Sequence, residues 1–116
     1  MRSDETHLLD MLLAAEKIQR FIKEISQQQF LEDEMRQSAV LREIQVIGEA
    51  ARLVSEDFKG KHETIPWGQI AGMRNRVIHE YFRVSLEIIW TTIQTDIPNL
   101  IREIRPLIPV DKNDSE

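Results

Sequence analysis

An arginine, a histidine and a tyrosine stand within eight consecutive residues at 74–81, where the sequence reads RNRVIHEY. Arg74 carries a fork of N–H donors that matches phosphate oxygens, and it keeps its positive charge at neutral pH. His79 can accept or donate a proton near neutral pH. On a helix, Asn75 would lie one turn before His79 and could orient its ring, and Tyr81 would lie nearly above Arg74. These residue types could bind and cleave a phosphodiester.

The set suits metal-free cleavage of RNA. A general base removes the proton of the 2′-hydroxyl, a cation stabilises the charged transition state, and an acid protonates the departing 5′-oxygen. That chemistry needs two proton-transfer groups, and the motif holds one histidine. Arg74 and His79 lie about 140° apart on a regular helix, so they converge only where the helix bends or where the site lies across two subunits. A two-fold dimer would bring two copies of both residues to one cleft.

An arginine and a histidine on one helix more often have a structural role than a catalytic one. Asn75 could hydrogen-bond at a helix terminus, and Tyr81 could be a half-buried aromatic residue with its hydroxyl at the surface. Glu80 could be a solvated partner of Arg76 or Arg83. On spacing alone, the catalytic and the structural interpretations both stay open.

Long helices are expected to position this run, because residues 2–47 contain neither glycine nor proline. Ser3 can cap a first helix with an apolar stripe at three- and four-residue steps. That stripe consists of Leu8, Met11, Leu12, Ala15, Ile18, Ile22 and Ile25. A second helix is expected over about 33–59, with a heptad-like seam suited to antiparallel packing. That seam consists of Val40, Ile44, Ile47, Ala51, Val54 and Phe58.

Glycine and proline mark the later boundaries. Gly48 lies inside the second helix, which predicts a close approach of another backbone there. Gly60 is expected to end that helix as its C-terminal cap. Pro66 suits the first turn of a third helix over about 67–82. Ser85 can cap a fourth helix.

The predicted architecture is an all-α, up-down bundle of four main helices. Pro98 either kinks the fourth helix or restarts it after Asp96, which would leave a short fifth piece. No β-alternation of useful length is present. Residues 1–110 are expected to form one domain, and 111–116 a frayed polar tail.

Composition excludes several classes of protein. The chain has 116 residues, of which 41% are hydrophobic and 30% charged, as in soluble globular proteins. It has no cysteine, so it forms no disulfide and no thiolate metal site. No apolar run approaches the ~20 residues of a membrane helix, and no secretory signal is visible. We therefore expect a cytoplasmic protein with no membrane partner.

The net charge of −5 has the wrong sign for a protein that coats nucleic acid without specificity. The charge is unevenly spread. Residues 1–60 carry 8 basic and 12 acidic side chains, whereas residues 74–83 hold three arginines against one glutamate. This pattern predicts weak general binding of RNA with focused contact at Arg74, Arg76 and Arg83.

The chain resembles the HepT-like ribonuclease toxins of the HEPN superfamily, the partners of minimal nucleotidyltransferase (MNT) antitoxins. Their signature is an arginine, four intervening residues, a histidine, one residue and a tyrosine, with an asparagine typical directly after the arginine. It corresponds here to Arg74, Asn75, His79 and Tyr81. Further matches are IGEAAR at 47–52, IPW at 65–67 and the W…DIP run at 90–98. Ser85 stands where the family more often has an aspartate cap, which leaves the site residues untouched.

This resemblance implies an HEPN-like homodimer whose motif lines a shared cleft. Arg74 and His79 would be catalytic, with Asn75 and Arg76 in support, and the substrate would be messenger or transfer RNA. A cognate nucleotidyltransferase would transfer AMP to Tyr81. Each AMP would add negative charge and bulk beside the arginines and so block phosphate entry.

The hypothesis is therefore a metal-independent endoribonuclease toxin of a type VII-like toxin–antitoxin pair, without a cofactor. It would act as a homodimer and could form a higher hetero-oligomer with its antitoxin. The alternative is a non-catalytic nucleotide- or substrate-binding subunit of a nucleotidyltransferase. That subunit would use the same polar cluster to hold a phosphate without cleaving it.

The other candidate sites are weaker. Asp4 and His7 have a spacing that could ligate a metal, but no second such pair exists, and an exposed terminal histidine is expected. His62 is expected to be solvated. Trp67 and Trp90 are expected to be anchors of the core or of an interface.

Overall fold

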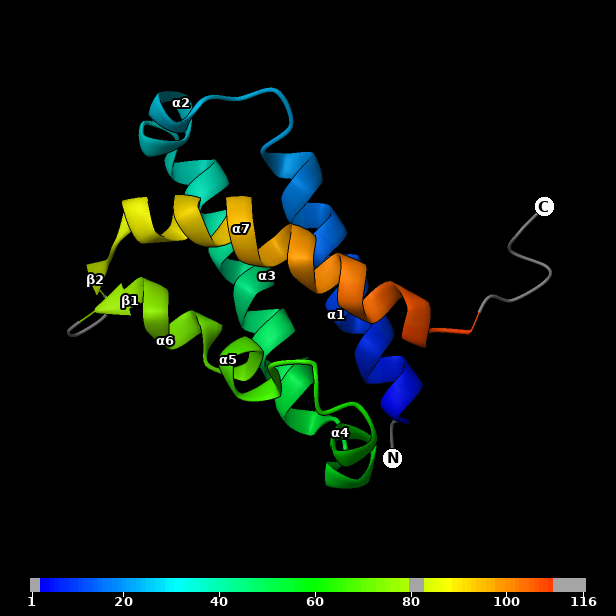
Figure 1. Ribbon diagram of the computed structural model, residues 1–116. Helices are drawn as coiled ribbons and strands as arrows, with labels where there is room; N and C mark the ends of the chain where they lie inside the picture. The colour runs from blue at the N-terminus through cyan, green and yellow to red at the C-terminus, as the bar shows by residue number, and fades with distance from the viewer. Residues whose placement is uncertain (1–2, 80–82, 110–116) are drawn as a thin grey trace, which may run out of the picture.

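Three long helices form the body of the protein (Figure 1). The computed structural model describes residues 3–79 and 83–109. The long helices are α1 (Asp4–Phe21), α3 (Glu34–Leu53) and α7 (Leu86–Ile104), and α1 packs against both of the others. The short elements are α2 (Gln27–Leu31), α4 (Glu56–Lys61), α5 (Trp67–Ala71), α6 (Met73–Val77), β1 (Ile78–His79), β2 (Arg83–Val84) and the 3-10 turn η1 (Arg105–Leu107).

The apolar stripes that the periodicity predicts make up the core. Ser3 caps α1 as expected, because its side chain accepts a hydrogen bond from the backbone N–H of Thr6. The α1 stripe is buried from Leu8 to Ile18, and the α3 seam is buried from Val40 to Val54. Each buried valine, leucine, isoleucine or methionine of these stripes contributes about 1.5–3 kcal/mol when it leaves water, so the α1–α3 pair is the main support of the fold.

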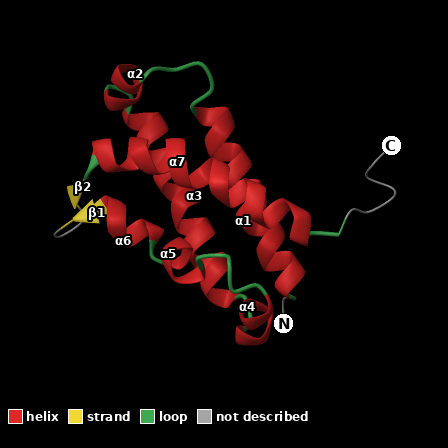
Figure 2. Ribbon diagram, viewed as in Figure 1, coloured by secondary structure: helices red, strands yellow, loops and turns green. Residues whose placement is uncertain are grey.

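The all-α bundle is confirmed, and Figure 2 shows how little of the described chain is extended. One antiparallel ladder was not predicted. It pairs Ile78 with Val84 and His79 with Arg83. The last helix also runs without interruption through Pro98, where a kink or a restart was expected.

The second predicted helix, 33–59, is wrong near its C-terminal end. It ends at Leu53, and Ser55 caps the separate helix α4 by accepting a hydrogen bond from the backbone N–H of Phe58. Ser55 also donates from its backbone N–H and its hydroxyl to Asp4, at 2.8 and 2.7 Å. Gly60 lies inside α4 and is not its cap, because His62 takes that position.

The third predicted helix, 67–82, is not one continuous helix, and the described part of it is helical only as far as Val77. It is divided into α5 and α6, with Gly72 as the residue that ends α5. After Val77 the backbone becomes extended, and the Val77 carbonyl accepts a hydrogen bond from the backbone N–H of Ser85 at 2.9 Å. β-Branched side chains at 77, 78 and 84 favour this extended conformation over a helix.

The close approach predicted at Gly48 is present. A Cβ atom on Gly48 would lie 3.0 Å from the Ala71 carbonyl oxygen, the last residue of α5. The absent side chain therefore lets α5 lie directly on α3. This contact sets the position of α6, which begins two residues later.

We expect Gly48→Ala to destabilise the protein by about 1 kcal/mol, because overpacking against a backbone carbonyl outweighs the gain in helix propensity. Gly60→Ala is the matched control, since a Cβ there meets nothing within 4 Å, and it should stabilise by about 0.5–1 kcal/mol. Denaturant unfolding of both variants measures the difference. Equal stabilisation by both substitutions would contradict the close approach.

Candidate functional site

A groove of about 640 Å³ runs across α3, with α1 on one side and α5 and α6 on the other. We call it the arginine groove, because Arg42, Arg52 and Arg74 line it. Arg74 and Asn75 reach it from α6, so the first two residues of the predicted motif lie in one concave site. His7 and Asp10 reach it from α1.

Among the described residues, two of the three guanidinium groups of the groove have no carboxylate partner. Arg52 donates two hydrogen bonds to Glu49, at 2.6 and 3.3 Å, which raise the pKa of Arg52 and lower the pKa of Glu49. Within residues 3–79 and 83–109, neither Arg42 nor Arg74 forms an ion pair. Arg42 is exposed and Arg74 is half-buried, and arginines in a concave site are suited to bind phosphate through paired N–H donors.

Arg76 occupies the opposite side of α6. Residues two positions apart on a helix differ in direction by about 200°, so Arg74 and Arg76 point to different faces. The Arg76 guanidinium lies 2.9 Å from the Asp96 carboxylate on α7. It lines a separate cavity of about 380 Å³ between α5, α6 and α7. The structure therefore separates Arg76 from Arg74 and Asn75, and joins Arg76 to Asp96 on α7.

His79 lies on β1 and not on a helix. The helical spacings assumed for the motif therefore do not apply, because the chain leaves the helix after Val77. Between Arg74 and His79 the chain leaves the helix, at the end of α6. Tyr81 and Glu80 lie outside the described residues.

His7 was expected to be exposed, and this prediction is wrong. Only 7% of His7 is exposed, because it lies on α1 next to the buried Leu8. The sequence did carry the signal, since positions 7, 11 and 18 repeat with the helical period of the buried stripe. The neighbouring carboxylate of Asp4 is bound to Ser55.

Hydrogen bonds from Ser55 are the main reason that the pKa of Asp4 lies below its usual value, and attraction to His7 and Lys59 adds to the effect. Asp4 therefore stays ionised at neutral pH. It places a fixed negative charge near the His7 end of the arginine groove.

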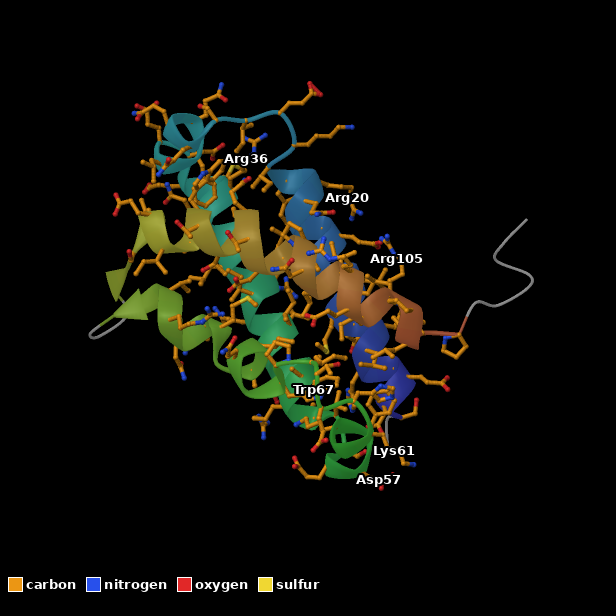
Figure 3. All side chains as sticks on the ribbon, in the orientation of Figure 1. Arg20, Arg36, Asp57, Lys61, Trp67 and Arg105 are labelled. Carbon is orange, nitrogen blue, oxygen red and sulfur yellow. The ribbon has the colours of Figure 1, made fainter. Side chains whose placement is uncertain are left out.

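The other aromatic candidates contribute to packing. Trp67, labelled in Figure 3, meets the ring of Phe58 on α4 edge-on. The indole N–H of Trp67 donates to the His62 carbonyl at 3.0 Å. The His62 ring stacks on Phe58 with 4.4 Å between centroids, so it is partly buried and not solvated as expected. Trp90 packs on Phe30 at 5.4 Å. Both tryptophans therefore contribute to packing, as predicted.

Comparison with known proteins decides the family. The model of a family described as "Ribonuclease HepT-like" matches residues 11–107. The chain belongs to this HepT-like family. It is 42% identical to "Probable ribonuclease HepT" of Thermococcus cleftensis over 99 residues, which cover 85% of this chain and 90% of the relative.

Two further relatives of this HepT-like chain carry similar names. "Putative RNase TTE0752" of Caldanaerobacter subterraneus subsp. tengcongensis is 36% identical over 97% of this chain and 100% of its own length. "Putative RNase MJ1380" of Methanocaldococcus jannaschii is 33% identical over 89% of this chain and 94% of its own length. No solved structure matches. In the described part of the chain, no helix combines the length and the apolar character needed to span a membrane.

Proposed function

We propose that this HepT-like chain is a metal-independent endoribonuclease toxin and that its active site is the arginine groove together with His79, which follows α6 on β1. Ribonuclease activity follows from membership of the family. The observation that carries the finer assignment is that Arg42 and Arg74, neither in an ion pair within the described residues, share one groove with Asn75. Arg74 would bind the scissile phosphate and stabilise its charge, and His79 would transfer protons.

Asn75 and Arg76 support this site in different ways. Asn75 is exposed at the groove beside Arg74 and can donate its amide N–H to a phosphate oxygen. Arg76 acts from the other face, where its ion pair with Asp96 joins α6 to α7. It would hold α6 in place and would not contact RNA in the groove.

A homodimer would complete the cleft. Leu9, Leu13 and Leu53 are 41%, 48% and 47% exposed. Leu53 lines the groove, and Leu13 follows Asp10 by one helical turn on α1. Large exposed apolar side chains at the border of a polar site favour a protein interface there. A two-fold axis at this border would bring two arginine grooves together and double the basic contacts with RNA.

Regulation by a cognate nucleotidyltransferase antitoxin is part of this proposal. AMP transferred to Tyr81 would add negative charge two residues beyond His79. That charge would compete with RNA phosphate for the arginines of the groove. Messenger or transfer RNA would be the substrate of the unmodified chain.

Co-expression tests the toxin–antitoxin part of the proposal. The chain alone should arrest bacterial growth, and His79→Ala should not. A nucleotidyltransferase encoded beside it should restore growth and raise the mass of Tyr81 by units of AMP, with Tyr81→Phe as the unmodifiable control. Binding of RNA or nucleotide by a chain that is neither toxic nor cleaving would instead identify a non-catalytic subunit.

A further inference from the structure

The face of α3 that lines the arginine groove carries a row of long polar side chains. Steps of three and four residues place them on one side of the helix. This row consists of Arg42, Gln45, Glu49 and Arg52. The helix rises by about 15 Å from the first of them to the last. A ligand that lies along the whole row is therefore longer than one phosphate group.

Arg42 is the cation of this row that has no carboxylate partner. Arg52 donates two hydrogen bonds to Glu49. Arg42 is exposed, and within residues 3–79 and 83–109 it forms no ion pair. The proposed reaction assigns the scissile phosphate to Arg74 and leaves Arg42 without a role. A guanidinium group of this kind is suited to a second phosphate.

Arg42 and Arg74 enter the groove at different places. Gly48 is the point at which α3 meets Ala71 of α5, and Arg42 precedes it by six residues, or about 9 Å along the helix axis. Arg74 comes instead from α6, which begins two residues after Ala71. The groove of about 640 Å³ is of the size that holds a whole small molecule, about 300–1,000 Å³. It therefore has room for more than one phosphate.

The charges of the groove suit a chain of phosphates. Its lining carries three arginines against the two carboxylates of Asp10 and Glu49, in a chain whose net charge is −5. The positive charge is thus local, and it attracts anions to the groove and not to the protein as a whole. Each nucleotide of an RNA strand adds one negative charge. Successive phosphates of one strand therefore match guanidinium groups that stand apart in one groove.

We propose that Arg42 binds the phosphate of a nucleotide next to the scissile bond. The site then favours RNA chains with several phosphates over dinucleoside monophosphates, which have one. This inference rests on the proposed ribonuclease function and names its substrate class. Arg42 contacts the substrate away from the reacting atoms, so it contributes to binding and not to the chemical step.

The first test is binding of a fluorescent 2′-O-methyl RNA oligonucleotide of about 10 residues, within the length that one single-strand-binding domain covers. Its methylated 2′-oxygen cannot attack the phosphate. Arg42→Ala should raise Kd about tenfold, as expected for one charge-assisted contact. The slope of log Kd against log salt concentration should fall by about 0.7, the value for one phosphate of a single strand. Arg42→Lys keeps the charge and should restore the slope.

Arg20→Ala is the matched control for binding. Arg20 is an exposed arginine on the last turn of α1, outside the groove (Figure 3). Its substitution removes the same charge, so Kd and the salt slope should stay near their wild-type values. Wild-type affinity and slope in Arg42→Ala would overturn the proposal. So would an equal loss of affinity in Arg20→Ala and Arg42→Ala, because the effect would then be one of net charge.

Cleavage kinetics test the substrate class. With an oligoribonucleotide, Arg42→Ala should raise KM about tenfold and keep kcat, because the contact binds the ground state and the transition state alike. With a dinucleoside monophosphate, the variant and the wild-type chain should cleave at the same rate. Equal loss of kcat/KM on both substrates would contradict contact with a neighbouring phosphate.

The outcomes separate this inference from the proposed function. If the wild-type chain binds the methylated oligonucleotide through Arg42 but cleaves no RNA, the ribonuclease function is refuted and the phosphate contact stands. If the wild-type chain cleaves RNA and Arg42→Ala matches it in Kd and KM, the role of Arg42 is refuted and the ribonuclease function stands.

Discussion

Arg74→Ala is expected to lower RNA cleavage by at least about 10²–10³-fold, the usual effect of removing one preorganised donor to a developing negative charge. The side chain lines the arginine groove and has no ion-pair partner among the described residues. The free energy of unfolding should hardly change, because the substitution removes no ion pair among the described residues. Purified, unmodified protein and a fluorescent RNA substrate suffice to measure the rate.

Arg76→Ala provides the matched control for Arg74→Ala. It removes the same side chain two residues away, on the face of α6 that meets α7. The Arg76 and Asp96 side chains are 46% and 31% exposed, so losing this ion pair should cost at most about 1 kcal/mol. Cleavage should fall less than tenfold. Equal loss of activity in both variants would contradict the assignment of separate faces.

Leu13→Glu is expected to convert the proposed dimer into monomers and to lower cleavage. The substitution places a carboxylate at the apolar border of the groove, where it would face its own symmetry copy. Loss of one central apolar anchor costs about 2 kcal/mol or more, which raises the dissociation constant of the dimer by at least about 30-fold. Sedimentation and the concentration dependence of cleavage measure both effects.

Ile88→Glu is the control for the interface. Ile88 is 37% exposed on α7 and lies away from the arginine groove, beside Arg76. This variant should stay dimeric and active. A wild-type chain that sediments as a monomer while cleaving RNA, or dimers in both variants, would place the proposed interface elsewhere.

Periodicity was enough to predict the helical core. The buried side of α1 and α3 follows directly from apolar residues at three- and four-residue steps, and Gly48 marked the contact with α5. These features are local in sequence. The buried faces and the glycine contact follow from residue spacing along the sequence.

The breaks in the helices could not be predicted because they depend on distant partners. Ser55 starts α4 while it is bound to Asp4, a residue 51 positions earlier. The end of α6 at Val77 is accompanied by pairing of β1 with β2. Such contacts form only in the folded chain and override local helix propensity.

The sequence indicated the lining of the candidate groove only in part. The motif located Arg74 and Asn75, and the structure brings them together in one groove. Spacing alone grouped Arg76 with them, although helical geometry places it on another face. The prediction that His7 is exposed relied on its nearness to the N-terminus. Its place in the apolar period of α1 indicates burial instead.

The most direct test of the central claim is cleavage of RNA by the purified, unmodified chain in excess EDTA, with the ends of the products identified. The arginine groove with His79 should cleave under these conditions and leave 2′,3′-cyclic phosphate and 5′-hydroxyl ends, and Arg74→Ala should leave the RNA intact. Cleavage that requires added Mg²⁺, or that Arg74→Ala performs at the wild-type rate, would contradict a metal-independent site in this groove.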